Sequence, residues 1–435
     1  VFDECTPQVG SNGATLLRGT VLTPDNVICN GQVLISRSTE RILCVAEDCS
    51  GEAEAAQATV ICTDIIAPGL IDTHNHMTYN TVPPWRHPGV LYEHRTEWLW
   101  DDAFNAYDVR LNGDAADRYS EFRLLMSGTT SVHKSSYLNA TFTGVRNLDR
   151  DENGSGLGLP NSAITECVYP LSSSCDDKPD YDNLDPSLRA YIVHLCEGIN
   201  QTSYKEFQTF VNDGQLGDRT ALIHGVSFDS HQIAYIASAG ATFIWSPQTN
   251  IDLYGVTAPV PAIWNMGVAV ALAPDWTISG TMNLIAELKC ADYLNNKYYG
   301  TFFSAKDLAS MVTSGAARVL HIDDLIGVLQ AGHFADVLAL SGDRQHPYDG
   351  LVQMQSADVR AVFIGGEAFY GDADALNPDI EFNAYCEELE VCGATKRICV
   401  KQSPGDPPQP LNDDDWATWN LTDYLSYLQA QLDQL

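Results

Sequence analysis

The chain has 435 residues, 45% of them hydrophobic, so it can enclose a large core, and one α/β barrel could use most of this length. Its 57 acidic and 24 basic residues give a formal charge of −33, which excludes ready binding to nucleic-acid phosphates or anionic membranes. No apolar run approaches the roughly 18 residues that span a bilayer. We therefore expect a small-molecule substrate, no nucleic acid and no membrane insertion, while homo-oligomerisation stays open.

The twelve cysteines indicate an exported protein, secreted or periplasmic. Ten lie in polar or turn-rich sequence and are expected to be mostly disulfide-bonded, Cys167 with Cys175 foremost because that bond closes a short loop. Cys196 and Cys290 lie in apolar patterns and should be free. At least one bond is expected among three cysteines near the C-terminal end: Cys386, Cys392 and Cys399. A second, structural zinc site is the alternative, but no Cys-x2-Cys pair supports it.

The first elements read as short strands separated by turn-rich sequence, which predicts a small antiparallel sheet. These strands are expected at 14–18, 31–36, 41–45 and 58–62.

The next stretch, Asp64 to Met77, delivers two histidines after an apolar run that is broken by Pro68-Gly69. Residues i and i+2 of a strand point the same way, so His74 and His76 should project together from the strand end. This geometry suits two ligands of one zinc or iron ion.

Residues 79–118 form an aromatic-rich insertion, which favours a lid or pocket wall, although packing of a satellite helix explains it equally. A helix is expected at 117–126, a strand at 129–133 and a loop-rich region at 148–190. Further strands are expected at 190–194, 220–224, 241–245 and 268–275, and their ends lie about 20 to 30 residues apart. This rhythm predicts βα units with a parallel sheet.

The C-terminal part returns to strands after a helix at 304–320. Strands at 335–340 and 359–364 are expected to complete the sheet of the N-terminal segment. A Pro-rich stretch from 400 precedes an amphipathic stretch, 416–435, that is expected to form a docked helix.

Functional side chains gather at the predicted strand ends, as they do in a (β/α)8 barrel. Three imidazoles and one carboxylate can bind a divalent metal and leave one position for water. The strand-end residues from which such a set can be drawn are His74, His76, His194, His224 and Asp275.

Together these motifs resemble the amidohydrolase superfamily, in its cytosine deaminase, chlorohydrolase and guanine deaminase branch. The resemblance covers roughly residues 14 to 370. It is carried by Pro68-Gly-Leu-Ile-Asp-Thr-His-Asn-His76, His194-Leu-Cys-Glu197, His224, Ser246-Pro-Gln-Thr-Asn250 with Leu253-Tyr-Gly255, Ala273-Pro-Asp275 and Gly327 to Asp336.

The resemblance implies an α/β fold, a distorted (β/α)8 TIM barrel with a small β-sandwich built from both chain ends. The implied boundaries are 1–66 and 326–400 for the sandwich, 67–325 for the barrel and 401–435 for a linker and terminal helix. By position, one divalent ion, zinc in preference to iron, would be bound by His74, His76, His194 and Asp275. The catalytic residues would be Glu197 as proton shuttle, His224 facing the water or substrate, and Asp275 taking a proton from the water.

Two departures limit what the resemblance implies about the substrate. Trp276 stands where family members usually have glycine, and the segment 246–248 lacks a basic residue often found there. Lys134 is a weaker candidate for a carboxylated lysine of a two-metal site, because it follows the wrong strand. His133 could line the pocket or serve only in packing.

The leading interpretation is a metal-dependent hydrolase that deaminates a cyclic amidine or aromatic amine. Hydrolysis of a linear or cyclic amide on the same site is the alternative. A catalytically silent binding member of the fold is a third, although every ligand position is filled.

Overall fold

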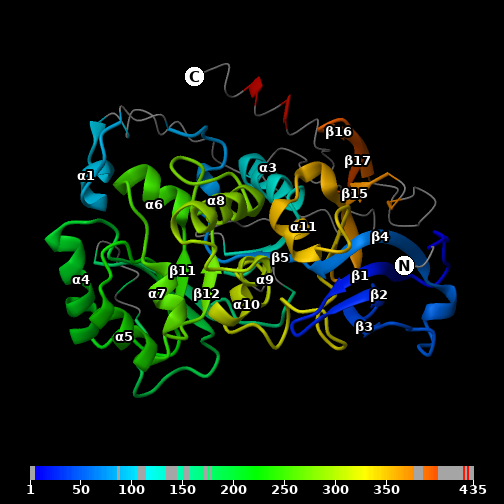
Figure 1. The fold of residues 1–435 in the computed structure, drawn as a ribbon, viewed down its shortest axis with the longest axis horizontal. Helices are drawn as coiled ribbons and strands as arrows, with labels where there is room; N and C mark the ends of the chain where they lie inside the picture. The colour runs from blue at the N-terminus through cyan, green and yellow to red at the C-terminus, as the bar shows by residue number, and fades with distance from the viewer. Residues whose placement is uncertain are drawn as a thin grey trace.

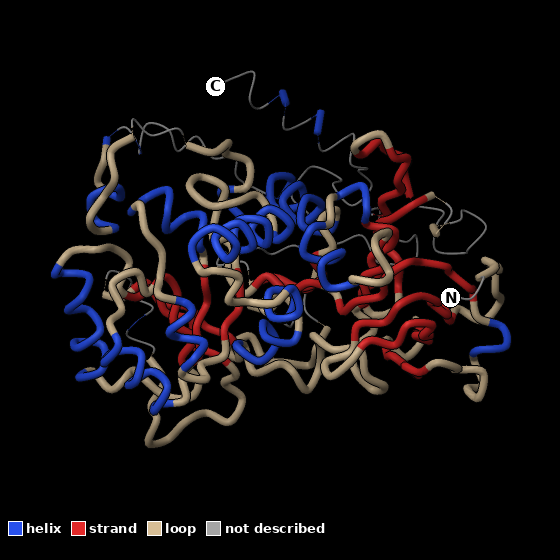
Figure 2. The backbone as a smooth tube through the Cα atoms, in the orientation of Figure 1, coloured by secondary structure: helices blue, strands red, loops and turns tan. Residues whose placement is uncertain are grey.

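The computed structural model describes residues 5–85, 89–102, 104, 114–133, 145–149, 156–170, 175, 178–373, 375, 376, 386–399, 425, 426, 429 and 430. Within them lie two parts (Figure 1; Figure 2). One is a large sheet made from both ends of the sequence, and the other is a set of parallel strands, surrounded by helices, made from the residues between those ends. The expected terminal helix at 416–435 and Lys134 lie outside the described residues, apart from 425, 426, 429 and 430.

The large sheet contains nine strands from both ends of the sequence, as expected. Seven of its eight pairings are antiparallel, but β1 and β4 run parallel, so the expectation of a purely antiparallel sheet is wrong at this pair. In spatial order the strands are β16 (Cys386–Val391), β17 (Ala394–Cys399), β15 (Glu367–Asp372), β14 (Val359–Ile364), β13 (Val337–Leu340), β4 (Thr59–Pro68), β1 (Ala14–Leu22), β2 (Val27–Ser36) and β3 (Arg41–Ala46).

The parallel strands form two sheets in chain order. The first holds β5 (Leu70–Asp72), β6 (Thr129–Val132) and β7 (Arg146–Asn147). The second holds β8 (Ile164–Val168), β9 (Ala190–Leu195), β10 (Thr220–His224), β11 (Thr242–Trp245) and β12 (Val270–Leu272). Among the described residues no ladder joins the two sheets, but an isolated bridge between Asn75 and Asp275 brings the segments after β5 and β12 together.

One of these strands corrects the sequence analysis. β8 lies inside 148–190, which was expected to be loop-rich, and it pairs in parallel with β9. Its neighbour β9 and the next strand of the sheet, β10, are entirely buried, as expected of apolar strands covered on both faces.

The helices follow the parallel strands and carry ordinary end signals. Asp229 and Gln232 form a capping box at the start of α5, which ends at Gly240 with a φ of 72°. The helix expected at 304–320 is two short helices, because residues 311–313 leave the helix. The helices are α1 (Arg95–Leu99), α3 (Asp114–Leu125), α4 (Gln201–Asn212), α5 (Ser230–Ala239), α6 (Pro247–Tyr254), α7 (Val260–Asn265), α8 (Leu284–Tyr298), α9 (Ala305–Ser310), α10 (Ser314–Val319) and α11 (Pro347–Gln353).

The structure contains four disulfides. Cys196 and Cys290 are free, as expected. The bonds are Cys5–Cys62, Cys44–Cys49, Cys167–Cys175 and Cys386–Cys399. Cys29 and Cys392 are also free, and both are exposed. None of the described helices is both long and apolar enough to cross a bilayer.

Candidate metal centre and active site

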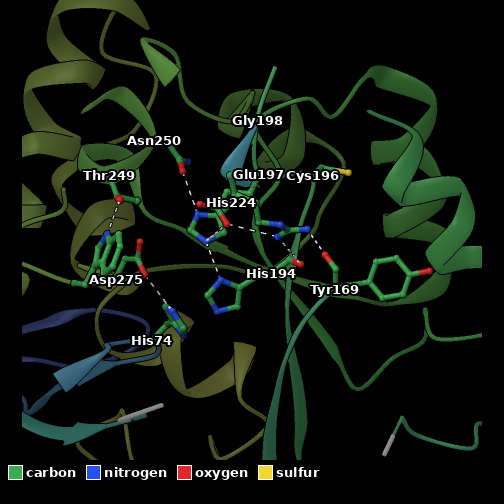
Figure 3. Close-up of polar contacts among 12 residues, drawn as sticks. His74, Tyr169, His194, Cys196, Glu197, Gly198, His224, Thr249, Asn250 and Asp275 are labelled. Atoms are coloured by element: carbon green, nitrogen blue, oxygen red, sulfur yellow. Dashed lines mark hydrogen bonds and ion pairs between the residues drawn. The ribbon is translucent and has the colours of Figure 1, made fainter. Parts of the chain in front are cut away.

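Three of the expected ligands bring their donor atoms close together where β5 and β12 end, and Figure 3 labels two of them, His74 and Asp275. Nε2 of His74 lies 3.1 Å from Nε2 of His76. Oδ1 of Asp275 lies 3.3 Å from the first of these nitrogens and 3.4 Å from the second. Ligands about 2.1 Å from a tetrahedral zinc ion are roughly 3.4 Å apart, so the three atoms fit one divalent ion.

The backbone fixes this arrangement. The amide of His76 donates to the carbonyl of Asp275, and the amide of Asp275 donates to the carbonyl of His74. Asp275 has a φ of 69°, and His224 at the end of β10 has a φ of 73°. Non-glycine residues rarely adopt this left-handed conformation, and such strain is concentrated at functional sites.

The fourth expected ligand, His194 on β9, lies in a row of polar contacts (Figure 3). Its Nδ1 lies 3.1 Å from Nε2 of His224, whose Nδ1 lies 3.2 Å from Oδ1 of Asn250. On the other side of the ring, Nε2 of His194 lies 2.7 Å from Oε1 of Glu166. His194 therefore joins the expected residues to one that the sequence analysis missed.

Glu166 was missed because its strand, β8, was not expected. One donor atom from each of His74, His76, Glu166 and His194 lies within 4.8 Å of the others, so these four could hold a metal ion. A signal was present in the sequence: Glu166 lies roughly 30 residues after His133 and roughly 30 before His194, the interval of the other strand ends.

The electrostatics of this group favour a cation. Burial raises the pKa of Asp275, but the hydrogen bond with His74 and the charge of His224 outweigh it and hold that pKa far below its usual range. Burial, reinforced by His74, lowers the pKa of His76 to about 3, and burial also lowers the pKa of His194. The site thus offers an ionised carboxylate at Asp275 and neutral imidazoles at His76 and His194, the forms that bind metals.

Glu197, the expected proton shuttle, is buried three residues beyond His194. Its Oε1 accepts a hydrogen bond of 2.8 Å from the Tyr254 hydroxyl, which itself accepts one of 2.8 Å from Nε1 of Trp98. Its Oε2 lies 3.5 Å from both Nε2 of His224 and a guanidinium nitrogen of Arg95. Burial raises the pKa of Glu197, but the charges of His224 and Arg95 lower it by more than burial raises it. The carboxyl is therefore ionised at neutral pH.

Arg95, which the sequence analysis did not single out, is held by several acceptors. One guanidinium nitrogen lies 2.8 Å from Glu206 and also donates to the carbonyl of Tyr169. The other donates to the carbonyl of His194 at 3.3 Å. Arg95 begins α1 in the aromatic insertion, so it ties that insertion to the strand ends.

A cavity of about 160 Å³ opens above these groups, and His76, His194, Glu197, His224 and Asp275 all line it. Its walls are aromatic, and three rings surround that of Trp276: Tyr79 at 5.0 Å, Trp98 at 5.2 Å and Phe104 at 5.7 Å between centroids. The described part of the insertion therefore forms a pocket wall, one of the two roles left open.

His133 also lies near the centre. Its ring stacks against that of His74 with centroids 6.2 Å apart, and its Nδ1 lies 3.9 Å from Oε2 of Glu166. It is not among the described residues that line the cavity, so of the two roles left open it does not take the one of lining the pocket.

Comparison with known proteins identifies the class. Residues 192–369 match the model of the amidohydrolase family. The chain is 24% identical to 5-methylthioadenosine/S-adenosylhomocysteine deaminase of Desulfitobacterium hafniense over 422 residues, 86% of this chain and 97% of the relative. It is also 24% identical to a protein of that name from Halobacterium salinarum, over 82% of this chain and 92% of the relative.

Solved structures show the same fold. An atrazine chlorohydrolase from Arthrobacter aurescens TC1, complexed with zinc, has a TM-score of 0.61 at 18% identity, covering 82% of this chain and 95% of the other. An adenosine deaminase from Xanthomonas campestris with bound zinc has a TM-score of 0.56 at 17% identity, covering 81% and 92%. The expected α/β fold class is confirmed.

The fold and the site define a metal-dependent hydrolase of the kind that acts on carbon–nitrogen bonds. Over residues 192–369 the chain resembles the amidohydrolase family, and the expected enzyme class, a metal-dependent hydrolase, is confirmed.

Proposed function

We propose that this enzyme deaminates a neutral heteroaromatic amine, with 5-methylthioadenosine or adenosine as the first candidates. The observation that carries the proposal is the convergence of His74, His76 and Asp275 beneath an aromatic-walled cavity that Glu197 and His224 also line. We further propose that one divalent ion is bound by His74, His76, His194 and Asp275, with zinc preferred. Such an ion would lower the pKa of a water molecule and polarise the bond under attack.

The chain's own residues supply the proton transfers. The attacking water loses two protons in all. Oε1 of Glu197 is held by Tyr254, so Oε2, which faces His224 and Arg95, is the atom that would carry one proton to a ring nitrogen of the substrate. Asp275, ionised because its pKa is held low, would take the other and pass it to the amino group that leaves as ammonia. His224, once protonated, would stabilise negative charge that develops on the substrate.

The shape and charge of the cavity support a planar, neutral substrate. Tyr79, Trp98, Phe104 and Trp276 present ring faces and edges on which a purine can stack. Arg95 is the one cation among the described lining residues besides the histidines, and Glu206 and Glu197 already surround it. A substrate carboxylate or phosphate would therefore lack a free cation, in keeping with the missing basic residue at 246–248.

The four disulfides support a further proposal, that the chain matures in an oxidising, exported compartment.

The test is a release assay over matched substrates. Metal-loaded protein is incubated with adenosine, 5-methylthioadenosine, S-adenosylhomocysteine, an aminotriazine, a chlorotriazine and a cyclic amide, and ammonia, chloride and new carboxylate are measured separately. We expect ammonia from the neutral purines at least about 10-fold faster than from S-adenosylhomocysteine, whose amino-acid end is charged. Carboxylate or chloride without ammonia from any amine would overturn the deaminase proposal.

A further inference from the structure

Three buried side chains form a chain of hydrogen bonds that ends at the proposed proton shuttle. Nε1 of Trp98 donates to the hydroxyl of Tyr254 at 2.8 Å, and that hydroxyl donates to Oε1 of Glu197 at 2.8 Å. Trp98 and Glu197 line the active-site cavity, whereas Tyr254 is not among the described residues that line it. The chain of hydrogen bonds therefore joins two groups that face the substrate through one that does not.

The indole at the start of this chain fixes the direction of the bonds. An indole nitrogen can only donate, so the hydroxyl hydrogen of Tyr254 cannot point at Trp98. Among the described residues, the acceptor that remains for this hydrogen is Oε1 of Glu197. A proton on Oε1 would place two hydrogens in one contact, so a proton carried by Glu197 belongs on Oε2. That atom lies 3.5 Å from Nε2 of His224, on the side of the cavity.

Backbone hydrogen bonds hold the three side chains together, although they come from α1 in the insertion, from the residues after β9 and from the last residue of α6. The Arg95 amide donates to the carbonyl of Glu197 at 3.2 Å. The Tyr92 amide donates to the carbonyl of Leu253, the residue before Tyr254, at 2.8 Å. The insertion is thus anchored beside both partners of its indole.

We propose that Trp98 and Tyr254 are positioning residues for proton transfer. Acting through Tyr254, the Trp98 indole fixes Oε1 of Glu197 as an acceptor and leaves Oε2 to carry the proton. This inference rests on the proposed function, in which Glu197 carries a proton to the substrate. It gives the aromatic insertion a second role besides forming the pocket wall, because the insertion supplies the indole.

The competing role for Trp98 is packing alone. Its ring centroid lies 5.2 Å from that of Trp276 and 5.3 Å from that of Phe104, so its replacement can also change the pocket wall. Such a change acts on substrate binding directly and does not need Tyr254. A double-mutant cycle separates the two roles, because only the proposed one makes the effect of Trp98 on kcat depend on Tyr254.

The experiment measures kcat and KM for metal-loaded wild type, Trp98→Phe, Tyr254→Phe and the double variant. Each phenylalanine keeps an aromatic ring and removes the polar group. The substrate is the best one from the release assay, whichever product it yields. We expect Tyr254→Phe to lower kcat about 10- to 100-fold, as loss of a hydrogen bond to a charged group typically does, and Trp98→Phe to lower it less. In the Tyr254→Phe protein, adding Trp98→Phe should change kcat by less than about twofold.

Tyr191→Phe is the matched control, because it also removes a buried tyrosine hydroxyl, one that donates to Gln215 at 3.0 Å. Its kcat should stay near the wild-type value. A second readout does not depend on turnover: the indole N–H signal of Trp98 in the nitrogen–proton NMR spectrum, identified by its absence from Trp98→Phe. Loss of the hydroxyl acceptor should move this signal in Tyr254→Phe, and it should stay in place in Tyr191→Phe.

Each outcome supports or overturns the inference. Losses of kcat that multiply in the double variant, or an indole signal that does not move, would overturn it and leave the proposed function intact. The cycle decides it in the same way if the substrate yields chloride or carboxylate, a result that overturns only the proposed deamination. Wild-type protein without any turnover would overturn both. If Tyr254→Phe does not fold, Glu197→Gln takes its place in the cycle, and a further loss of kcat on adding Trp98→Phe contradicts the inference.

Discussion

At the scale of single residues, Glu197 is the side chain whose replacement separates chemistry from metal binding most cleanly. It is held by Tyr254 and faces Arg95 and His224, yet it is not among the proposed ligands. Glu197→Gln keeps the size and the Tyr254 contact but cannot carry a proton. We expect kcat to fall at least about 100-fold, because general acid–base catalysis contributes about 100- to 10,000-fold.

Metal content and melting temperature, measured on the same preparation, control for structural damage. Both should stay near the wild-type values. Near-normal turnover with the metal intact would remove Glu197 from the mechanism, and loss of metal would show that it serves as a ligand or a structural carboxylate instead.

The sequence was most informative where chemistry and strand periodicity coincide. His74 and His76 stand two apart at the end of an apolar run, and His194, His224 and Asp275 each end or follow one, so all five could be placed at strand ends. Glu166 could not, because its strand of five residues, Ile164–Val168, is flanked by turn-rich sequence. Arg95 gave no signal at all, since its role depends on a fold-back of the insertion onto β9.

At the scale of elements, the junction between the large sheet and the parallel strands depends on Gly69. β4 runs to Pro68 in the large sheet, and β5 begins at Leu70 among the parallel strands. A Cβ on Gly69 would lie 2.3 Å from the Thr130 side chain on β6, so only glycine fits this close approach. The sequence pattern marked the Pro68-Gly69 break but not that strands on either side belong to different sheets, because pairing partners are set by distant segments.

A second element-scale feature is Glu287 in α8, which accepts hydrogen bonds from the Gln248 amide at the start of α6 and from Thr281. Burial raises its pKa from 4.5 to about 8. The folded state therefore keeps a proton that the unfolded state loses between these values, so the free energy of unfolding falls as pH rises through this window.

Glu287→Gln replaces this group with a neutral side chain of the same size and removes its contribution. In metal-free protein we expect the variant to lose less stability than wild type between pH 5 and pH 8, by about 1 kcal/mol or more. Urea unfolding at several pH values measures the difference. Parallel pH dependence in the two proteins would show that Glu287 is not protonated in the folded state.

At the scale of the whole molecule, the cysteines divide into eight bonded and four free. Thiol titration of denatured, unreduced protein should therefore find four groups per chain. In the native protein the exposed Cys29 and Cys392 should react first, because burial raises the pKa of both Cys196 and Cys290, the latter to about 12. A count near twelve would contradict both the disulfides and the exported location.

The central claim, one divalent ion per chain that is required for deamination, is tested most directly by titrating metal into metal-free protein while recording ammonia release. The substrate is the best one from the release assay, and bound metal is measured on the same samples. We predict no ammonia without metal, a linear rise as metal is added, and a break at one equivalent per chain. Full activity after metal removal, or a break at two equivalents, would contradict the claim.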